Sequence, residues 1–171
     1  MTFEKEFPGA SWLSAQVFRE LEVVGGLAEA LIATVARRHG LSHAALNALA
    51  VIEGNGSPMA AGEVGDRVHI TSGTMTSVLD TLERNGYIQR LSDPDDRRRV
   101  LVDVTPEAQA VLNRLLPEVV QTTTAVMDRF DDKELFAFLG TLARVRAAIA
   151  ATPDDLPPPA PRRTPRNLRR F

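Results

Sequence analysis

One short stretch in the middle of this 171-residue chain constrains the fold more than any other part. It begins with two short helical patterns, residues 60–68 and 71–85, which only two residues separate. Helices joined so closely form a helix-turn-helix. Two β-rich pieces follow, residues 87–91 and 100–104, and the polar tip 92–99 between them predicts a β-hairpin with a charged end. We therefore expect a winged helix-turn-helix, in which the second helix enters the DNA major groove and the hairpin reaches beside it.

Longer helical patterns flank this stretch on both sides. Apolar residues recur at steps of three and four from residue 11 to 35, from about 106 to 129, and from 132 to 149. Ser42 can cap a further helix, which the glycine-containing run 53–58 should break. The fold class is therefore expected to be mainly α, with one two-stranded hairpin.

Local signals refine these helices. Gly25 and Gly26 lie inside the first one and cost about 1 kcal/mol each relative to alanine, which predicts a kink there. Thr105 can cap the helix that starts near residue 106. Asp131, followed three residues later by Glu134, resembles a capping box that opens the last helix.

Composition excludes several classes of function. The chain is 44% apolar and 25% charged, so it can bury one core but is too short for a large multidomain enzyme. The absence of cysteine removes disulfides, thiolate metal sites and cysteine nucleophiles. No apolar run reaches the roughly 18 residues of a membrane span, and residues 1–10 lack a signal-peptide pattern. We expect a soluble cytoplasmic protein.

The net charge of −2 is distributed unevenly along the chain. Residues 153–171 hold five arginines against Asp154 and Asp155 and so carry +3, which leaves −5 on residues 1–152. The same segment holds six of the eleven prolines and shows no apolar pattern. Such a segment cannot bury enough surface to order itself, so we expect a disordered basic arm.

The winged stretch resembles a known family. The runs Glu63-Val-Gly-Asp-Arg-Val-His-Ile70, Thr71-Ser-Gly-Thr-Met-Thr-Ser77, Leu82-Glu-Arg-Asn-Gly86 and Asp93-Pro-Asp-Asp-Arg-Arg-Arg-Val100 are similar to those of the MarR family of bacterial transcriptional regulators. The resemblance covers essentially residues 11–150. It implies a homodimer whose first and last helices intertwine, with each subunit reading one half of a pseudopalindromic DNA operator.

The resemblance also suggests how the chain is organised. The expected segments are an N-terminal segment (1–10), dimerisation helices (11–39 and 106–152), a winged helix-turn-helix DNA-binding domain (41–105) and the disordered tail (153–171).

The second helix of the motif is expected to face DNA. Its apolar residues fall on one side, and its other side carries short polar groups of the kind that contact bases and phosphates. A merely solvated surface is the alternative for such a face, but the hairpin that follows favours DNA. The candidate DNA-binding residues on this helix are Ser72, Gly73, Thr74, Thr76, Ser77 and Arg84.

The hairpin tip supplies the other candidates. In the resemblance, Asp96 and Arg98 fall on the family's Asp-x-Arg pair, in which the carboxylate sets the wing and the arginine enters the minor groove. Arg97 is the variable residue between them, and Arg99 follows. Ser77, on the preceding helix, stands where many members have a DNA-facing arginine.

The net charge of the winged stretch argues against DNA binding unless its basic residues are placed toward the DNA. Residues 57–105 contain six basic and eight acidic residues, a net charge of −2. Because DNA attracts positive charge, we expect the arginines to face forward and several acids to be paired or turned away. A protein interaction or assembly module that does not read DNA is the alternative function.

The family resemblance implies a repressor that a small lipophilic or phenolic effector releases from DNA. The effector is expected to bind near the junction of the dimerisation helices and the winged helix. The candidates for effector contact are therefore Trp12, Phe18, Leu46 and Met127. Residues of these types at helical spacing are more often plain core.

Metal and catalytic sites are not expected. His39 and His43 are four residues apart but straddle a helix break at Gly40, so they lack assured ligand geometry. Asp95 and Asp96 lie on an exposed hairpin with no pocket implied. A dimerisation fragment of a methyltransferase-like enzyme would need a cofactor motif, and the sequence has no glycine-rich one. We therefore expect no enzyme activity and no cofactor.

Overall fold

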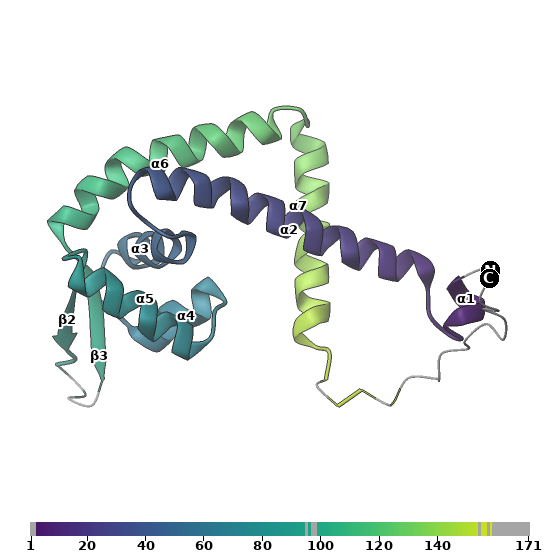
Figure 1. Cartoon of the computed structure of the whole chain (residues 1–171), viewed down its shortest axis with the longest axis horizontal. Coiled ribbons are helices and arrows are strands. Elements are labelled where there is room, and N and C mark those ends of the chain that lie inside the picture. Colours follow the sequence, from purple (N-terminus) through teal and green to yellow (C-terminus); the bar gives the residue numbers. More distant parts are fainter. Residues whose placement is uncertain (1–2, 95, 97–98, 154, 157, 159–171) are drawn as a thin grey trace, which may run out of the picture. The chain divides into compact units, whose positions relative to one another are not determined.

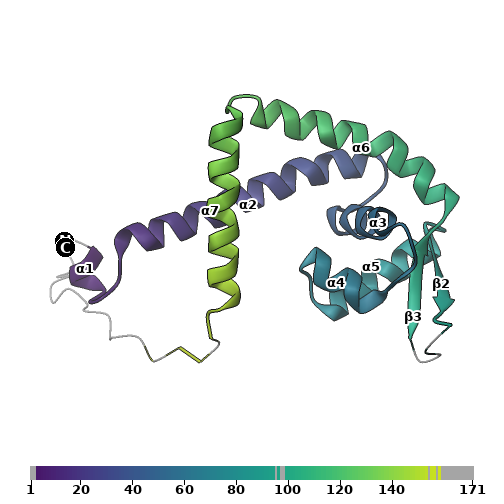
Figure 2. The ribbon, with the colours of Figure 1, turned by 180° about the vertical axis from the view of Figure 1, so that it is seen from behind.

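The computed structural model describes residues 3–94, 96, 99–153, 155, 156 and 158 (Figure 1; Figure 2 shows the reverse side). It divides into two compact units, treated separately below: unit 1 is Met1–Leu27 with Asp128–Phe171, and unit 2 is Ala28–Met127. The elements in chain order are α1 (Phe3–Glu6), α2 (Trp12–Arg38), α3 (His43–Asn55), β1 (Met59–Ala60), α4 (Ala61–Val68), α5 (Ser72–Arg84), β2 (Ile88–Ser92), β3 (Val100–Val104), α6 (Pro106–Met127) and α7 (Asp132–Ala150).

Unit 2 is organised around one apolar core. Helices α3, α4 and α5, the small sheet and the first half of α6 all contribute buried side chains to it. A fully buried aliphatic side chain stabilises a fold by roughly 1.5–3 kcal/mol, so this core fixes the helices of the winged motif relative to one another. Its largest fully buried side chains are Leu49, Ile52, Met75, Leu79, Leu82, Leu112, Leu115, Val64 and Val102.

The sheet of unit 2 confirms the predicted hairpin and adds a strand. Its three antiparallel strands lie in the order β1-β3-β2. Strands β2 and β3 pair in register from Ile88 opposite Val104 to Ser92 opposite Val100. The two-residue β1 was not predicted, because so short a segment shows no alternation; its Met59 pairs with Val102 and is buried.

The start of α3 follows the prediction, but its end does not. The Ser42 side chain accepts a hydrogen bond from the Ala45 amide at 3.1 Å, which confirms the cap. The prediction that the run 53–58 breaks the helix is wrong for its first three residues, which remain in α3. The break falls at Gly56, whose φ of 70° is left-handed and unfavourable for other residues.

Helix α2 runs without a break through Gly25 and Gly26, because two glycines cost little against the rest of a 27-residue helix, and the kink there stays a prediction. Helix α6 ends at Met127 rather than near residue 129, and it runs through Pro117. Phe130 lies beyond the helix and is exposed.

Unit 1 contains α1, the first part of α2, and α7. The predicted capping box is confirmed: the Asp131 carboxylate accepts from the Glu134 amide at 2.8 Å, and the Glu134 carboxylate accepts from the Asp131 amide at 2.9 Å. The helix α1 was not predicted. The predicted disordered arm, residues 153–171, lies almost entirely outside the described residues. No helix in the described part of the chain is both long and apolar enough to cross a membrane.

Candidate nucleic-acid interface

A tight turn joins the two helices of the motif. His69, which follows α4, adopts φ 58° and ψ 41°, the only left-handed conformation of a non-glycine residue among the described residues. Its amide donates to the carbonyl of Asp66, and the Ile70 amide donates to that of Gly65. These bonds end α4 and turn the chain into α5 within three residues. The close link predicted from the sequence is therefore confirmed.

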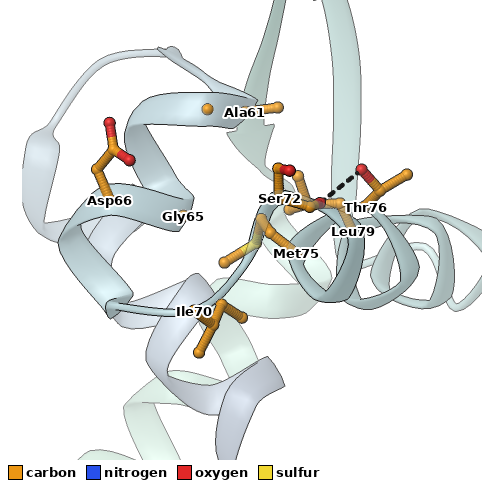
Figure 3. Close-up of a pocket in the computed structure, with 9 residues that line it drawn as sticks. Ala61, Gly65, Asp66, Ile70, Ser72, Met75, Thr76 and Leu79 are labelled. Carbon is orange, nitrogen blue, oxygen red and sulfur yellow. Dashed lines mark hydrogen bonds between the residues drawn. The ribbon is translucent and has the colours of Figure 1, made fainter. Parts of the chain in front are cut away.

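Helices α4 and α5 approach closely at Gly65. A Cβ atom at this position would lie 3.6 Å from the Cβ atom of Met75, which is ordinary van der Waals contact. Figure 3 shows Gly65 and Met75 on facing helices, with Ile70 in the turn beside them. A small hollow of about 170 Å³ remains between the helices, beside Asp66 and Thr76. The packing of Met75 against α4 sets the orientation of α5.

The two faces of α5 have opposite character, as predicted. Met75, Leu79 and Leu82 are buried in the core of unit 2. The opposite side is exposed and carries every candidate that the sequence placed on this helix, namely Ser72, Gly73, Thr74, Thr76, Ser77 and Arg84. The structure thus brings these candidates together on one solvent-facing surface, which we call the α5 face.

The start of α5 leaves backbone donors facing outward. Thr71 is the cap: its hydroxyl oxygen accepts from the Thr74 amide at 3.3 Å and lies 2.9 Å from the Thr74 hydroxyl. The amides of Ser72 and Gly73 have no partner within the helix, because the carbonyl four residues earlier lies before the helix begins. Such amides, at the positive end of a helix dipole, can donate to a phosphate group.

One arginine ties β2 to α5. Arg90 donates to the Asp80 carboxylate at 2.6 Å and lies 2.9 Å from the Glu83 carboxylate. The hydrogen bond with Asp80 raises the pKa of Arg90 above its ordinary value, burial opposes the rise, and the charges of Glu83 and Asp80 add to it. We call these three residues the Arg90 bridge. It pairs two of the acids that the sequence counted against DNA binding.

A second pairing organises the wing. Asp93 is only 7% exposed, its carboxylate accepts from the Asp96 amide at 3.3 Å, and it lies 3.7 Å from the Arg99 guanidinium. The Asp93 amide in turn donates to the Arg99 carbonyl, and the Arg99 amide to the Asp96 carbonyl. The candidates Arg97 and Arg98 lie outside the described residues.

Sequence reasoning missed the role of Asp93. It counted Asp93 only as a charge and assigned the wing-setting role to Asp96. The signal that could have found it is local: an aspartate directly before Pro94 is typical of the first position of a turn, where its carboxylate accepts from backbone amides further on.

The four effector candidates fall in different surroundings. In unit 1, Trp12 and Phe18 are exposed and line two separate hollows. In unit 2, Leu46 is buried in the core and Met127 is exposed at the end of α6. Their contact with an effector stays a prediction.

The histidines that could have suggested a metal site have protein partners. His39 Nε2 lies 3.0 Å from Glu118, which also pairs with Arg38. His43 is 3.5 Å from Glu29. Within the described residues, no three His, Asp or Glu side chains are grouped so as to hold a metal ion.

A tight helix-turn-helix followed by a paired hairpin defines this chain as a winged helix-turn-helix protein. The model of the MarR family matches residues 41–100, which span α3 to the first residue of β3. The HTH-type transcriptional regulator PecS of Dickeya dadantii is 29% identical over 131 residues, which are 75% of this chain and 79% of PecS. The chain is therefore similar to the MarR family over its winged helix-turn-helix.

Other comparisons agree. The HTH-type transcriptional regulator YcgE of Bacillus subtilis is 32% identical over 91 residues, 52% of this chain and 59% of YcgE. Among solved structures, Sco3205 of Streptomyces coelicolor, a MarR family transcriptional regulator in complex with DNA, superposes with a TM-score of 0.73 at 25% identity, covering 86% of this chain and 97% of Sco3205. The chain spans 59% of YcgE and 48% of a second curated relative, the HTH-type transcriptional repressor YetL of Bacillus subtilis.

Proposed function

We propose that this chain is a homodimeric, sequence-specific DNA-binding transcription regulator rather than an assembly module that ignores DNA. The observation that carries the proposal is the α5 face: five small polar or flexible residues in its first two turns are exposed while Met75 and Leu79 anchor the helix from behind. A helix held in this way can enter a major groove without its side chains blocking the approach. A relative of the same fold, Sco3205, was solved in complex with DNA.

The phosphate contacts of the proposed complex come from the start of α5. The Ser72 and Gly73 amides face outward there, next to the capped Thr74. Arg84 lies at the far end of the same face and has no carboxylate partner among the described residues, where its guanidinium donates to Thr81. In this proposal these groups hold the DNA backbone while Thr74 and Thr76 face the bases.

Local pairing makes the acidic composition compatible with this function. In the Arg90 bridge one guanidinium pairs with both Asp80 and Glu83, and Arg67 pairs with Glu63 at 2.7 Å. In this proposal the arginines of the run 97–99 supply further positive charge for DNA. Minor-groove insertion of Arg98, with Asp96 as its positioning partner, stays a proposal that rests on the family resemblance.

The proposed dimer explains the surface of unit 1. Its helices expose large apolar side chains, such as Leu27 (67% exposed) and Phe136 (72%), and α7 buries none of its residues within the described part of the chain. An apolar groove of about 590 Å³, lined by Phe18, Val145 and Ile149 among others, runs between α2 and α7. We propose that a second copy of the chain covers these faces, burying on the order of 2,000 Å² or more.

The dimer is tested by sedimentation of the full chain at micromolar concentration. Leu142→Glu and Leu21→Glu place a charge on the half-buried apolar stripes of α7 and α2 and should lower dimerisation and stability together. Leu142→Met, which keeps an apolar side chain of similar volume, is the control and should remain dimeric. A folded wild-type monomer would contradict the dimer.

The most detailed part of the proposal is that the protein represses transcription and that a small lipophilic or phenolic ligand relieves this repression. Phe18 supports it only in that it lines an apolar groove of suitable size. A panel of phenolic compounds, each added to the protein–DNA complex, should contain at least one that dissociates it. If the same compound dissociates the Phe18→Ala complex with DNA as readily as the wild-type complex, Phe18 is not part of the effector site.

DNA binding is tested by genomic footprinting of the full chain, beginning with the region upstream of its own gene. A discrete protected site is expected, and Thr76→Trp should abolish it while the dimer and the circular dichroism spectrum stay unchanged. Wild-type protein that protects no site and binds no duplex would favour the assembly module instead.

A further inference from the structure

Two hydroxyl groups of the α5 face, those of Thr76 and Ser77, donate their hydrogens to the helix backbone. Thr76 Oγ1 donates to the Ser72 carbonyl at 2.9 Å, and Ser77 Oγ donates to the Gly73 carbonyl at 3.2 Å. Thr81, one turn further along, donates in the same way to Ser77 at 3.0 Å. A hydroxyl has one hydrogen and two lone pairs, so each of these groups presents only an acceptor oxygen to an incoming ligand.

Figure 3 shows the consequence for Thr76. Its hydroxyl is turned back toward Ser72, along the dashed hydrogen bond, and its methyl group points away from Ser72. The side chain therefore presents a methyl group and a hydrogen-bond acceptor, but no hydrogen-bond donor.

Side chains that usually read guanine are missing from most of α5. Residues 72–83 contain no Arg, Lys, Asn, Gln or His, and Arg84 is the last residue of the helix. Guanine shows two acceptors, O6 and N7, in the major groove, and its usual partner is an arginine or a lysine. The N-terminal residues of a recognition helix are those that contact base edges, and here they offer guanine no arginine or lysine.

A face of methyl groups and acceptors suits a different set of base atoms. Thymine carries a C5 methyl group, and its partner adenine carries an N6 amino donor, both in the major groove. We propose that α5 reads A·T pairs through the thymine methyl group and the adenine amino group, with Thr76 as a specificity-determining residue, and does not read the guanine acceptors. This inference rests on the proposed function, because it assigns a base preference to the same helix.

The inference predicts different affinities for two modified DNAs. Deoxyuridine in place of thymidine removes only the C5 methyl group, and 7-deazaguanine in place of guanine removes only the N7 acceptor. The probes are duplexes selected by the full-length chain from a random-sequence library and then resynthesised with one modified base at a time. Loss of one buried methyl contact should weaken binding about fourfold at the positions under α5. Substitution with 7-deazaguanine should leave affinity unchanged.

A matched pair of variants assigns the effect to Thr76. Thr76→Ser keeps the hydroxyl and removes the methyl group, so at one thymine position it should bind the thymine and uracil duplexes equally. Thr76→Val keeps a methyl group in place and removes the acceptor, so it should retain the preference for thymine.

Each outcome bears on the inference in a distinct way. A loss with 7-deazaguanine under α5, or none with deoxyuridine, would overturn the base preference while leaving the DNA-binding function intact. A thymine preference that survives in Thr76→Ser would overturn the role of Thr76. Wild-type protein that binds no duplex at all would overturn the proposed function and this inference together.

Discussion

The Arg90 bridge makes a prediction about charge that composition alone would not. Arg90→Gln removes the guanidinium that holds Asp80 at 2.6 Å and Glu83 at 2.9 Å. Two carboxylates on α5 then lose their partner, next to the surface that we propose contacts DNA. The net charge of residues 57–105 falls from −2 (six basic and eight acidic residues) to −3 (five and eight).

The effect on stability should be small. The side chains of Arg90, Asp80 and Glu83 are 35%, 53% and 41% exposed, so water screens both ion pairs. Pairs of this kind contribute about 0.2–1 kcal/mol each. The melting temperature should fall by no more than about 8 °C, since about 1 kcal/mol corresponds to 2–4 °C in a chain of this length.

The effect on DNA binding should be larger than the stability change suggests. A unit charge about 4 Å from a phosphate in water interacts with it by roughly 1 kcal/mol, so the loss of one positive charge beside two carboxylates should weaken binding roughly fivefold at low salt. The deficit should shrink as salt increases, because exposed charges are screened. Fluorescence anisotropy with the footprinted duplex at several salt concentrations measures both effects.

Two comparison variants identify the cause. Arg67→Gln removes the same charge from α4, where Arg67 pairs with Glu63, and leaves α5 untouched. The triple variant Arg90→Gln, Asp80→Asn, Glu83→Gln removes the freed carboxylates and should restore at least wild-type affinity. If the triple variant binds as weakly as Arg90→Gln, or if Arg67→Gln and Arg90→Gln lose affinity equally, the reasoning from the bridge is refuted.

Three further predictions concern single positions. Asp93→Ala removes the carboxylate that holds Arg99 and should weaken DNA binding roughly tenfold in anisotropy assays although it deletes a negative charge; tighter binding would contradict it. His69→Gly relieves a left-handed backbone (φ 58°) and should stabilise the fold by about 0.5–1 kcal/mol in urea unfolding, after allowance for the added freedom of the unfolded chain; destabilisation would show that the His69 side chain has a packing role. Asp131→Ala deletes half of the capping box with Glu134 and should lower stability by about 1 kcal/mol, an effect that Asp131→Ser should largely avoid.

Most helices and the hairpin could be predicted because their signals are local. The caps at Ser42 and Asp131 depend on a side chain and an amide three residues away, and the hairpin depends on alternation within two short runs. The extra helical turn before Gly56 was missed because Gly54 is tolerated in a helix at modest cost and only the left-handed residue ends it. Strand β1 was missed because its pairing with β3, some forty residues later in the chain, leaves no pattern in two residues.

The chemistry of the candidate site was harder to predict than its position, because it depends on partners. The sequence identified Thr76 and Ser77 as polar groups on an open face, but it could not show that both hydroxyls donate to the helix backbone. That bond decides whether the helix presents donors or acceptors to DNA.

The same limit applies to charge. Arg90 and Asp80 are ten residues apart, on a strand and on a helix, so no helical or alternating period relates them. A count of charges gives each acid of the motif equal weight against DNA binding. The fold instead pairs Asp80 and Glu83 with Arg90 and buries the Asp93 side chain within the wing. An acidic composition is therefore compatible with DNA binding here because the acids near α5 are fixed by arginines that the fold, rather than the sequence order, brings to them.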